Sequence, residues 1–225
     1  MTIVTLWLAG DWITPILAGL VGLGFGFAAD RLAARWPEHE DGAVRARDWR
    51  TPVVAIIGAL AFAATAARFA PTPVHLAVVF PYIACLVVLF AIDLDQRLLP
   101  NVLTYPLVVY ALAVFGLGAS PFIPTIEDFA WAAAAAVAVP VALYVLAIPF
   151  GSGAIGEGDL KLLVSVGLLA GAAKLFYGLV VGAVAAGLIV GLLVFGRRLS
   201  MKSFVPYGPF LIAGTLWAIL ALPQP

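Results

Sequence analysis

Long apolar runs separated by short polar stretches make up most of this chain. A helix that crosses a bilayer needs roughly 17–25 mostly apolar residues. We expect helices at residues 12–34, 51–70, 75–92, 101–117, 128–150, 159–172, 175–196 and 207–222. The sixth run is short and bounded by glycine, so we expect a tilted or half-buried helix there. The pattern predicts an all-α, polytopic membrane protein with about eight transmembrane helices.

Composition supports a membrane protein and excludes several other classes. Of the 225 residues, 64% are hydrophobic and only 11% are charged, which is far from a soluble globular composition. The net charge is zero, so nothing suggests a nucleic-acid partner. The single cysteine, Cys85, excludes an internal disulfide and a C-x-x-C zinc site. We expect one membrane domain over residues 1–225, with residues 35–50 as a short cytoplasmic loop.

The distribution of basic residues predicts the orientation in the membrane. If the N-terminus lies outside, the cytoplasmic face holds Arg31, Arg35, Arg45, Arg47, Arg50, Arg97, Lys161, Arg197, Arg198 and Lys202, and the outer face holds Arg68 and Lys174. Cytoplasmic loops carry an excess of lysine and arginine, so both termini are expected outside the cytoplasm. The first ten residues contain no lysine or arginine, so we expect no cleaved signal peptide.

Two polar stretches interrupt the apolar pattern, and each contributes an aspartate. Asp93 follows the third expected helix, and Asp159 follows Gly156-Glu157-Gly158. An aspartate at the centre of a bilayer helix costs about 2.5–3.5 kcal/mol, so both should lie near an interface or face water. Two adjacent carboxylates resist ionising together and share one proton, so one acts as a base on water and the other as an acid. The pair therefore suggests acid/base chemistry on water, which is what peptide hydrolysis without a metal needs.

Each motif by itself also has an ordinary structural explanation. An aspartate directly before an apolar helix is a good N-cap, which fits Asp159. Asp93 and Asp95 equally suit a solvated loop between helices. Gly156 and Gly158 are common loop residues, although glycine also lets a substrate chain approach closely. His39 and His75 are expected on opposite sides of the membrane, so no Ser-His-Asp arrangement or metal cluster competes with the aspartates.

Taken together, the motifs resemble a known signature. The first part is Asp93-x-x-x-Arg97-x-Leu99-Pro100, and the second is Gly156-x-Gly158-Asp159. Further matches are Pro206-Tyr207-Gly208-Pro209-Phe210 near the C-terminus, and Gly26-Phe27-Ala28-Ala29-Asp30 with Arg35-Trp36-Pro37 near the N-terminus. In this order they resemble the type IV prepilin peptidases, membrane aspartic proteases that remove the leader of type IV pilins and pseudopilins.

The resemblance implies roles for individual residues. Asp93 and Asp159 would be the catalytic pair, within a peptidase core over residues 93–225. Gly156, Gly158, Arg97 and Pro100 would support the substrate and the loops. Asp95 does not fit the pattern, and we expect a water-exposed loop residue whose amide variant keeps activity.

The resemblance also implies a location and partners. The enzyme would lie in the bacterial inner membrane, surrounded by lipid. It would cut a prepilin or pseudopilin on the cytoplasmic side, after the glycine that ends a short basic leader. The peptidase reaction would need neither a metal nor a cofactor.

A second activity of that family, N-methylation of the new terminus with S-adenosylmethionine, stays open. Many members carry two C-x-x-C pairs in the first cytoplasmic loop, and residues 35–50 contain none. Asp30 replaces an asparagine, and Ala55 stands where a glutamate is common. These departures fall in the part associated with methylation and leave the peptidase motifs intact.

Two other functions remain alternatives. A presenilin-type G-x-G-D intramembrane protease also pairs two aspartates on helices. Against it stand Asp93-Leu94, where that group has a Tyr-Asp pair, and the better match of Arg97 and Pro100 to the prepilin peptidases. A transporter or a structural pilus-assembly protein would use intramembrane carboxylates for proton relay or packing. Inverted repeats would support a transporter, and the sequence has none that we detect.

The charge asymmetry generates a testable orientation. After Cys85 is replaced, a cysteine at position 43 should be inaccessible to an impermeant thiol reagent in sealed cells, because residues 35–50 are expected in the cytoplasm. It should become reactive once the cells are opened. Labelling of this position from the outside would contradict the orientation.

Overall fold

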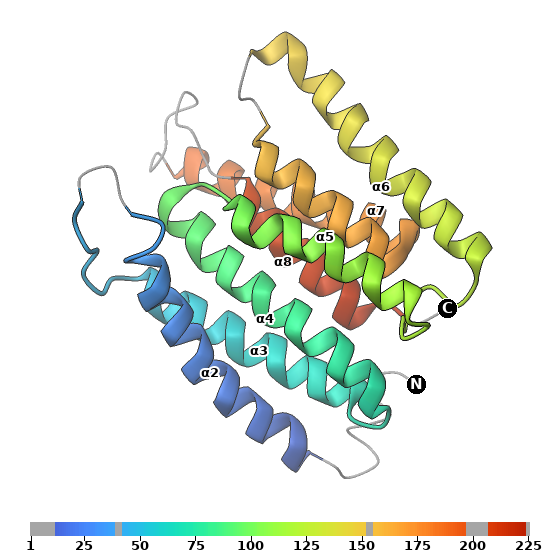
Figure 1. Ribbon diagram of the computed structural model, residues 1–225. Coiled ribbons are helices and arrows are strands. Elements are labelled where there is room, and N and C mark those ends of the chain that lie inside the picture. The colour runs from blue at the N-terminus through green and yellow to red at the C-terminus, as the bar shows by residue number, and fades with distance from the viewer. Residues whose placement is uncertain (1–11, 39–41, 152–154, 197–206, 224–225) are drawn as a thin grey trace.

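The chain folds into a bundle of helices (Figure 1). This computed structural model describes residues 12–38, 42–151, 155–196 and 207–223, and every regular element in these ranges is helical. The elements are α2 (Ile13–Ala33), α3 (Arg50–Phe69), α4 (Pro73–Gln96), α5 (Asn101–Gly116), α6 (Ile126–Ala147), η1 (Ile148–Phe150), α7 (Glu157–Phe195) and α8 (Gly208–Ala221). The prediction of an all-α protein is confirmed. Five helices (α2, α3, α4, α6 and α7) are long and apolar enough to cross a membrane, so this is a multi-pass membrane protein.

Helix α4 extends further than its apolar run predicts. The apolar residues stop at Ile92, but the helix continues to Gln96 and ends where Arg97 adopts a left-handed conformation (φ 57°, ψ 38°). Residues 93–96 include neither glycine nor proline, so nothing in them breaks the helix. The change from apolar to polar residues therefore marks a change in the surroundings of the helix and not its end. Asp93 and Asp95 therefore lie on the last turn of a helix, and the loop expected there is wrong.

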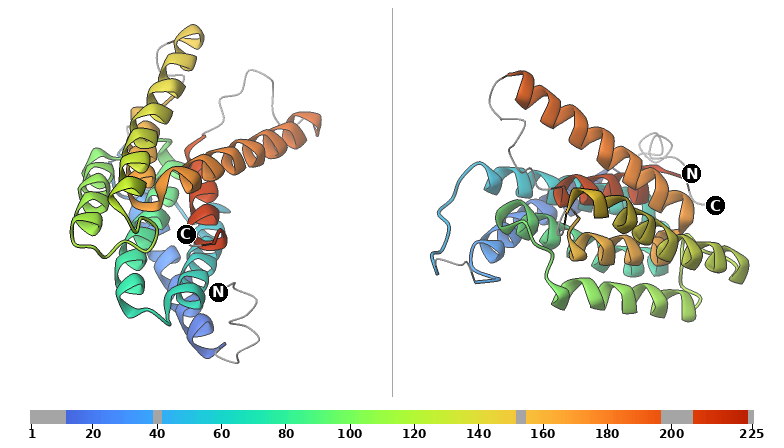
Figure 2. Two further views of the ribbon diagram at one scale, coloured as in Figure 1. Left: turned by 90° about the vertical axis from the view of Figure 1, so that its right-hand side faces the viewer. Right: turned by 90° about the horizontal axis from the view of Figure 1, so that it is seen from above.

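Helix α7 consists of two arms that meet at Gly171. The backbone of this residue (φ 87°, ψ 166°) lies in a region that is essentially restricted to glycine. The first arm carries the buried side chains Leu162, Leu163, Val166 and Leu169, so the short sixth helix is a core element. Figure 2 shows the second arm leaving the bundle at an angle, and its last residue, Phe195, is 91% exposed.

The core is built around α4, which packs against α2, α3 and α8. Its fully buried side chains include Tyr82, Ile83, Leu86 and Leu89. Helices α2 and α3 lie unusually close together, because a Cβ at Gly22 would collide with the carbonyl group of Gly58. Small residues let helix backbones approach closely in lipid, where dispersion contacts dominate helix association.

The two ends of the bundle differ in how they use charge. At one end, Arg68 donates to the Leu220 carbonyl oxygen (2.8 Å) and Lys174 donates to that of Pro223 (2.8 Å), which ties α3 and α7 to the end of α8. Cations are favourable at a helix C-terminus. The other end holds the remaining described basic residues and both aspartate motifs; Arg197, Arg198, Lys202 and His39 lie outside the described residues.

The close α2–α3 contact predicts unequal effects for two glycines on the same helix. Gly22→Ala should lower the melting temperature in detergent, because overpacking costs about 1–3 kcal/mol. Gly24→Ala is the matched control: nothing lies within 4 Å of its Cβ position, so it should be neutral or slightly stabilising. Equal melting temperatures for the two variants would contradict the contact.

Candidate active site

A cavity of about 360 Å³ lies where α4 ends and where α5 and α7 begin. Its lining consists of Asp93, Arg97, Leu98, Leu99, Pro100, Asn101, Gly156, Glu157, Gly158 and Asp159. All six residues singled out by sequence (Asp93, Arg97, Pro100, Gly156, Gly158 and Asp159) are therefore in one place. The two aspartates come from separate helices and interact electrostatically.

Asp93 is the buried member of the pair. It is only 4% exposed, and its Oδ2 atom has no hydrogen-bond partner within the described part of the chain. A buried polar atom without a partner is costly and calls for an explanation. A carboxyl group beside a second carboxyl group supplies one, because the pair can hold a proton.

Asp159 lies in the first turn of α7, three residues after the N-cap Gly156. The expectation that Asp159 itself is the N-cap is wrong, because the helix begins earlier, at Glu157. Its carboxylate accepts a hydrogen bond from the Gly156 backbone amide. This is the reciprocal half of a capping box, in which an acidic residue at the third helical position reaches back to the N-cap. The N-terminal end of a helix also favours negative charge.

Leu99 and Gly158 bring the two aspartates together. A Cβ at Gly158 would lie 2.6 Å from the Leu99 Cβ atom and 2.9 Å from the Leu99 carbonyl oxygen. Only glycine lets the start of α7 press against the connection between α4 and α5. Pro100 then starts α5: it is the N-cap, and its carbonyl oxygen accepts from Leu103 and Thr104 at 3.0 Å each. The resemblance implies that Gly158 supports the substrate, whereas in the structure it contacts Leu99.

Helix α8 contributes two residues for which the sequence analysis predicted no role. A Cβ at Gly208 would overlap the Asp93 carboxylate, with the Cγ atom at 2.7 Å. Burial, together with the nearby Asp159 charge, raises the pKa of Tyr207 above its ordinary value. The motif at residues 206–210 is far from both aspartates in the sequence, so its spacing does not predict this contact.

Arg97 lines the cavity, and Lys161 contacts two other lining residues, Asn101 and Glu157. The exposed Arg97 is close enough to Asp93 for an electrostatic attraction. Lys161 donates to Asn101 Oδ1 (2.9 Å) and pairs with Glu157 (3.2 Å). Lys161 therefore bridges the first turns of α5 and α7.

Asp95 is not the water-exposed loop residue expected from the sequence. Its side chain is 2% exposed, and Arg45 Nε and Arg50 Nη1 each lie 2.8 Å from its Oδ1 atom. The helix turns it away from Asp93 and towards α3 and the loop that precedes α3. The expectation that an amide variant of Asp95 keeps activity rested on exposure to water, which the structure does not show.

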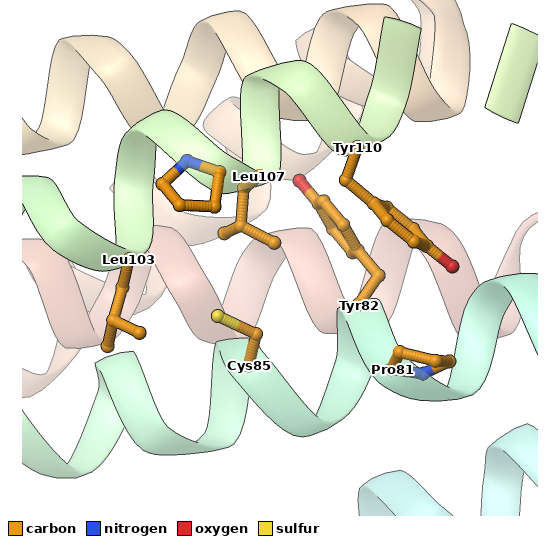
Figure 3. A pocket seen from close by; sticks show the side chains of 7 residues that line it. Pro81, Tyr82, Cys85, Leu103, Leu107 and Tyr110 are labelled. Carbon is orange, nitrogen blue, oxygen red and sulfur yellow. The ribbon is translucent and has the colours of Figure 1, made fainter. Parts of the chain in front are cut away.

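A smaller, apolar cavity of about 150 Å³ lies between α4 and α5 (Figure 3). Cys85 and Tyr82 of α4 face Leu103, Leu107 and Tyr110 of α5 there. The tyrosine hydroxyls are satisfied: Tyr82 bonds Ser165 (2.9 Å) and Tyr110 donates to the Val78 carbonyl oxygen (2.7 Å). Its lining holds no carboxylate.

Across the described ranges, no three His, Cys, Asp or Glu side chains are grouped so as to hold a metal ion.

Comparison with known proteins shows the family of this chain. The model of the type IV leader peptidase family matches residues 80–195, a span that contains both aspartates. The chain belongs to this family. No solved structure matches it.

Two curated relatives carry the name prepilin leader peptidase/N-methyltransferase, from Burkholderia pseudomallei strains 1026b and K96243. Each is 36% identical over 157 residues, which cover 68% of this chain and 48% of the relative. The chain therefore spans about half the length of these leader peptidase relatives.

Proposed function

We propose that this member of the leader peptidase family is an aspartic endopeptidase that cuts the leader from prepilin-like proteins at the cytoplasmic face of the membrane. The observation that carries the proposal is the single cavity lined by Asp93 and Asp159, which come from different helices. The family and the name of the relatives support leader peptides as the substrate class.

The environments of the two carboxyl groups divide their roles. Asp93 is more buried, and one of its oxygens has no partner in the described parts of the chain, so it is the better place for the shared proton. Asp159 is half-buried and has the Gly156 amide to stabilise its negative charge. Asp159 then takes a proton from water as the water attacks the scissile carbonyl carbon, and Asp93 gives its proton to the carbonyl oxygen.

The position of the cavity fits a substrate held partly in lipid. The cavity lies at the strongly basic end of the bundle, which we place in the cytoplasm of a bacterial inner-membrane protein with both termini outside. The apolar helix of a prepilin would lie in the bilayer against the enzyme, with its leader in water beside the cavity. Water then reaches the aspartates without crossing the bilayer.

N-methylation is a second candidate activity because the relatives' name includes it. The cationic groups of S-adenosylmethionine would need free carboxylates. Beside the first loop, Asp30, Asp48 and Asp95 are each paired with arginine and are not free for this role. These three carboxylates do not fit the cofactor, so no methylation step follows from them.

The two alternative functions are less well supported. Membership of the leader peptidase family favours neither a presenilin-type protease nor a transporter. Cleavage at mid-membrane would favour the first of them. Processing that persists after both aspartates are removed would favour a non-enzymatic role.

The central prediction is that both aspartates are essential. Asp93→Asn and Asp159→Asn keep the side-chain shape but remove the ionisable oxygen, so each should abolish leader cleavage. Loss of a general acid or a general base typically lowers the reaction rate by about 10²–10⁴-fold. If the pair can no longer share a proton, the general acid and the general base are both lost. The measurement is conversion of a prepilin in membranes, followed by mass analysis of the new N-terminus.

Two controls make this experiment decisive. Each variant must match the wild type in amount and melting temperature, so that a loss of folding is excluded. Chelators and serine or cysteine protease reagents should leave wild-type cleavage unchanged. Full cleavage by Asp159→Asn would refute the aspartate pair.

The same mass spectra test methylation of the new N-terminus. An enzyme-dependent gain of one methyl group with labelled S-adenosylmethionine supports methylation, and an unmodified terminus argues against it.

A further inference from the structure

The last turn of α4 is held from the side facing away from Asp159. Asp95 lies two residues after Asp93, which places it about 200° around the helix. Its Oδ1 atom accepts from Arg50 at 2.8 Å, and Arg45 Nε lies at the same distance. Neither arginine belongs to α4: Arg50 opens α3, and Arg45 lies in the loop before it.

Arg45 links the end of α4 to two other places. It pairs with the buried Asp30 of α2 and with Asp48 in its own loop (2.6 Å). Thr51 of α3 also donates to Asp30, at 2.7 Å. Burial alone would lower the pKa of Arg45, but the Asp30 and Asp95 carboxylates raise it above its ordinary value. Arg45 therefore stays charged and holds α2, the loop and α4 together.

The neighbouring residue strengthens the same attachment. Gln96 Nε2 donates to the carbonyl oxygens of Ala33 (3.0 Å) and Pro37 (2.7 Å), at the end of α2 and just beyond it. Two successive side chains thus fix a helix end that would otherwise fray. The Arg97 amide then closes the turn on the Asp93 carbonyl oxygen at 3.0 Å.

We propose that Asp95, Arg45 and Arg50 are positioning residues that hold Asp93 in place for catalysis. The proposal rests on the peptidase function above. None of the three lines the cavity. They act through the backbone of α4, whose last turn is gripped by this ion-pair cluster on one side and carries Asp93 on the other.

The cluster is sensitive to the loss of one member. Removing one partner of a buried ion pair leaves an uncompensated buried charge, which is strongly destabilising locally. Here the loss of Asp95 would leave Arg45 and Arg50 paired with Asp30 and Asp48, and neither arginine would then hold the end of α4. A catalytic group that shifts by 1 Å can lose about 10²-fold in rate, so a local shift is enough to matter.

The test compares two carboxylates that contact the same arginines. Asp95→Asn should lower kcat about tenfold to 10²-fold with little change in KM, because the substrate-binding surface is untouched. Asp95→Glu keeps the charge and should recover most of the rate. Asp48→Asn is the matched control: this residue is 35% exposed, pairs with Arg45 and Arg50, and does not belong to α4. It should keep a kcat within about twofold of wild type.

A structural readout separates this proposal from the peptidase function. Hydrogen exchange of a peptide over residues 90–98 should speed up in Asp95→Asn and stay unchanged in Asp48→Asn and Asp93→Asn. If Asp93→Asn keeps activity, the catalytic pair fails, and exchange still tests the attachment of α4. If Asp95→Asn does not fold, Arg50→Gln removes one of the two pairs and should give a smaller fall in kcat. Wild-type kcat and unchanged exchange in Asp95→Asn, or in Arg50→Gln where that variant replaces it, would overturn the proposal.

Discussion

The contact between Leu99 and Gly158 is the constraint on which the candidate site depends. Asp93 ends one helix and Asp159 begins another, so neither helix alone sets the distance between them. Because Gly158 has no Cβ, the start of α7 rests on the backbone of Leu99, which follows Asp93 by six residues. The first arm of α7 is held firmly in turn, since its buried side chains belong to the hydrophobic core. The contact between Leu99 and Gly158 therefore fixes how the two segments that carry the aspartates lie relative to each other.

The same end of the bundle shows charge used in two different ways. Around Asp30, Asp48 and Asp95, each carboxylate is paired with arginine, and the charges balance locally. Around Asp93 and Asp159, two carboxyl groups face one cavity, and an oxygen of Asp93 has no hydrogen-bond partner among the residues that the structure describes. A paired carboxylate is stabilised in its charged form, whereas an adjacent pair of carboxyl groups is suited to holding and transferring a proton. The surroundings of Asp30, Asp48 and Asp95 therefore suit ion pairs that stabilise the fold, whereas those of Asp93 and Asp159 suit proton transfer.

The kink in α7 connects the core to the periphery. Gly171 lets one helix serve as a buried core element in its first arm and as an outer helix in its second. Lys174 follows closely and binds the Pro223 carbonyl oxygen, which anchors the kink to the end of α8. Helix α8 in turn starts at Gly208, against Asp93. The kink thus helps to hold α8 in the register that brings its first residue to the cavity.

The sequence by itself determined the all-α class and the approximate spans, because long apolar runs are local properties of the chain. The resemblance of its motifs to the type IV prepilin peptidases implied the six residues that share the cavity. The sequence misjudged Asp95, the start of α7 and the end of α4, since a polar residue next to an apolar run looks the same whether it faces water or a buried arginine. It also predicted no role for Gly208 and Tyr207, whose neighbours lie far away along the chain. Only the tertiary structure decided these points, because a buried ion pair or a helix packed onto a carboxylate exists only once distant segments meet.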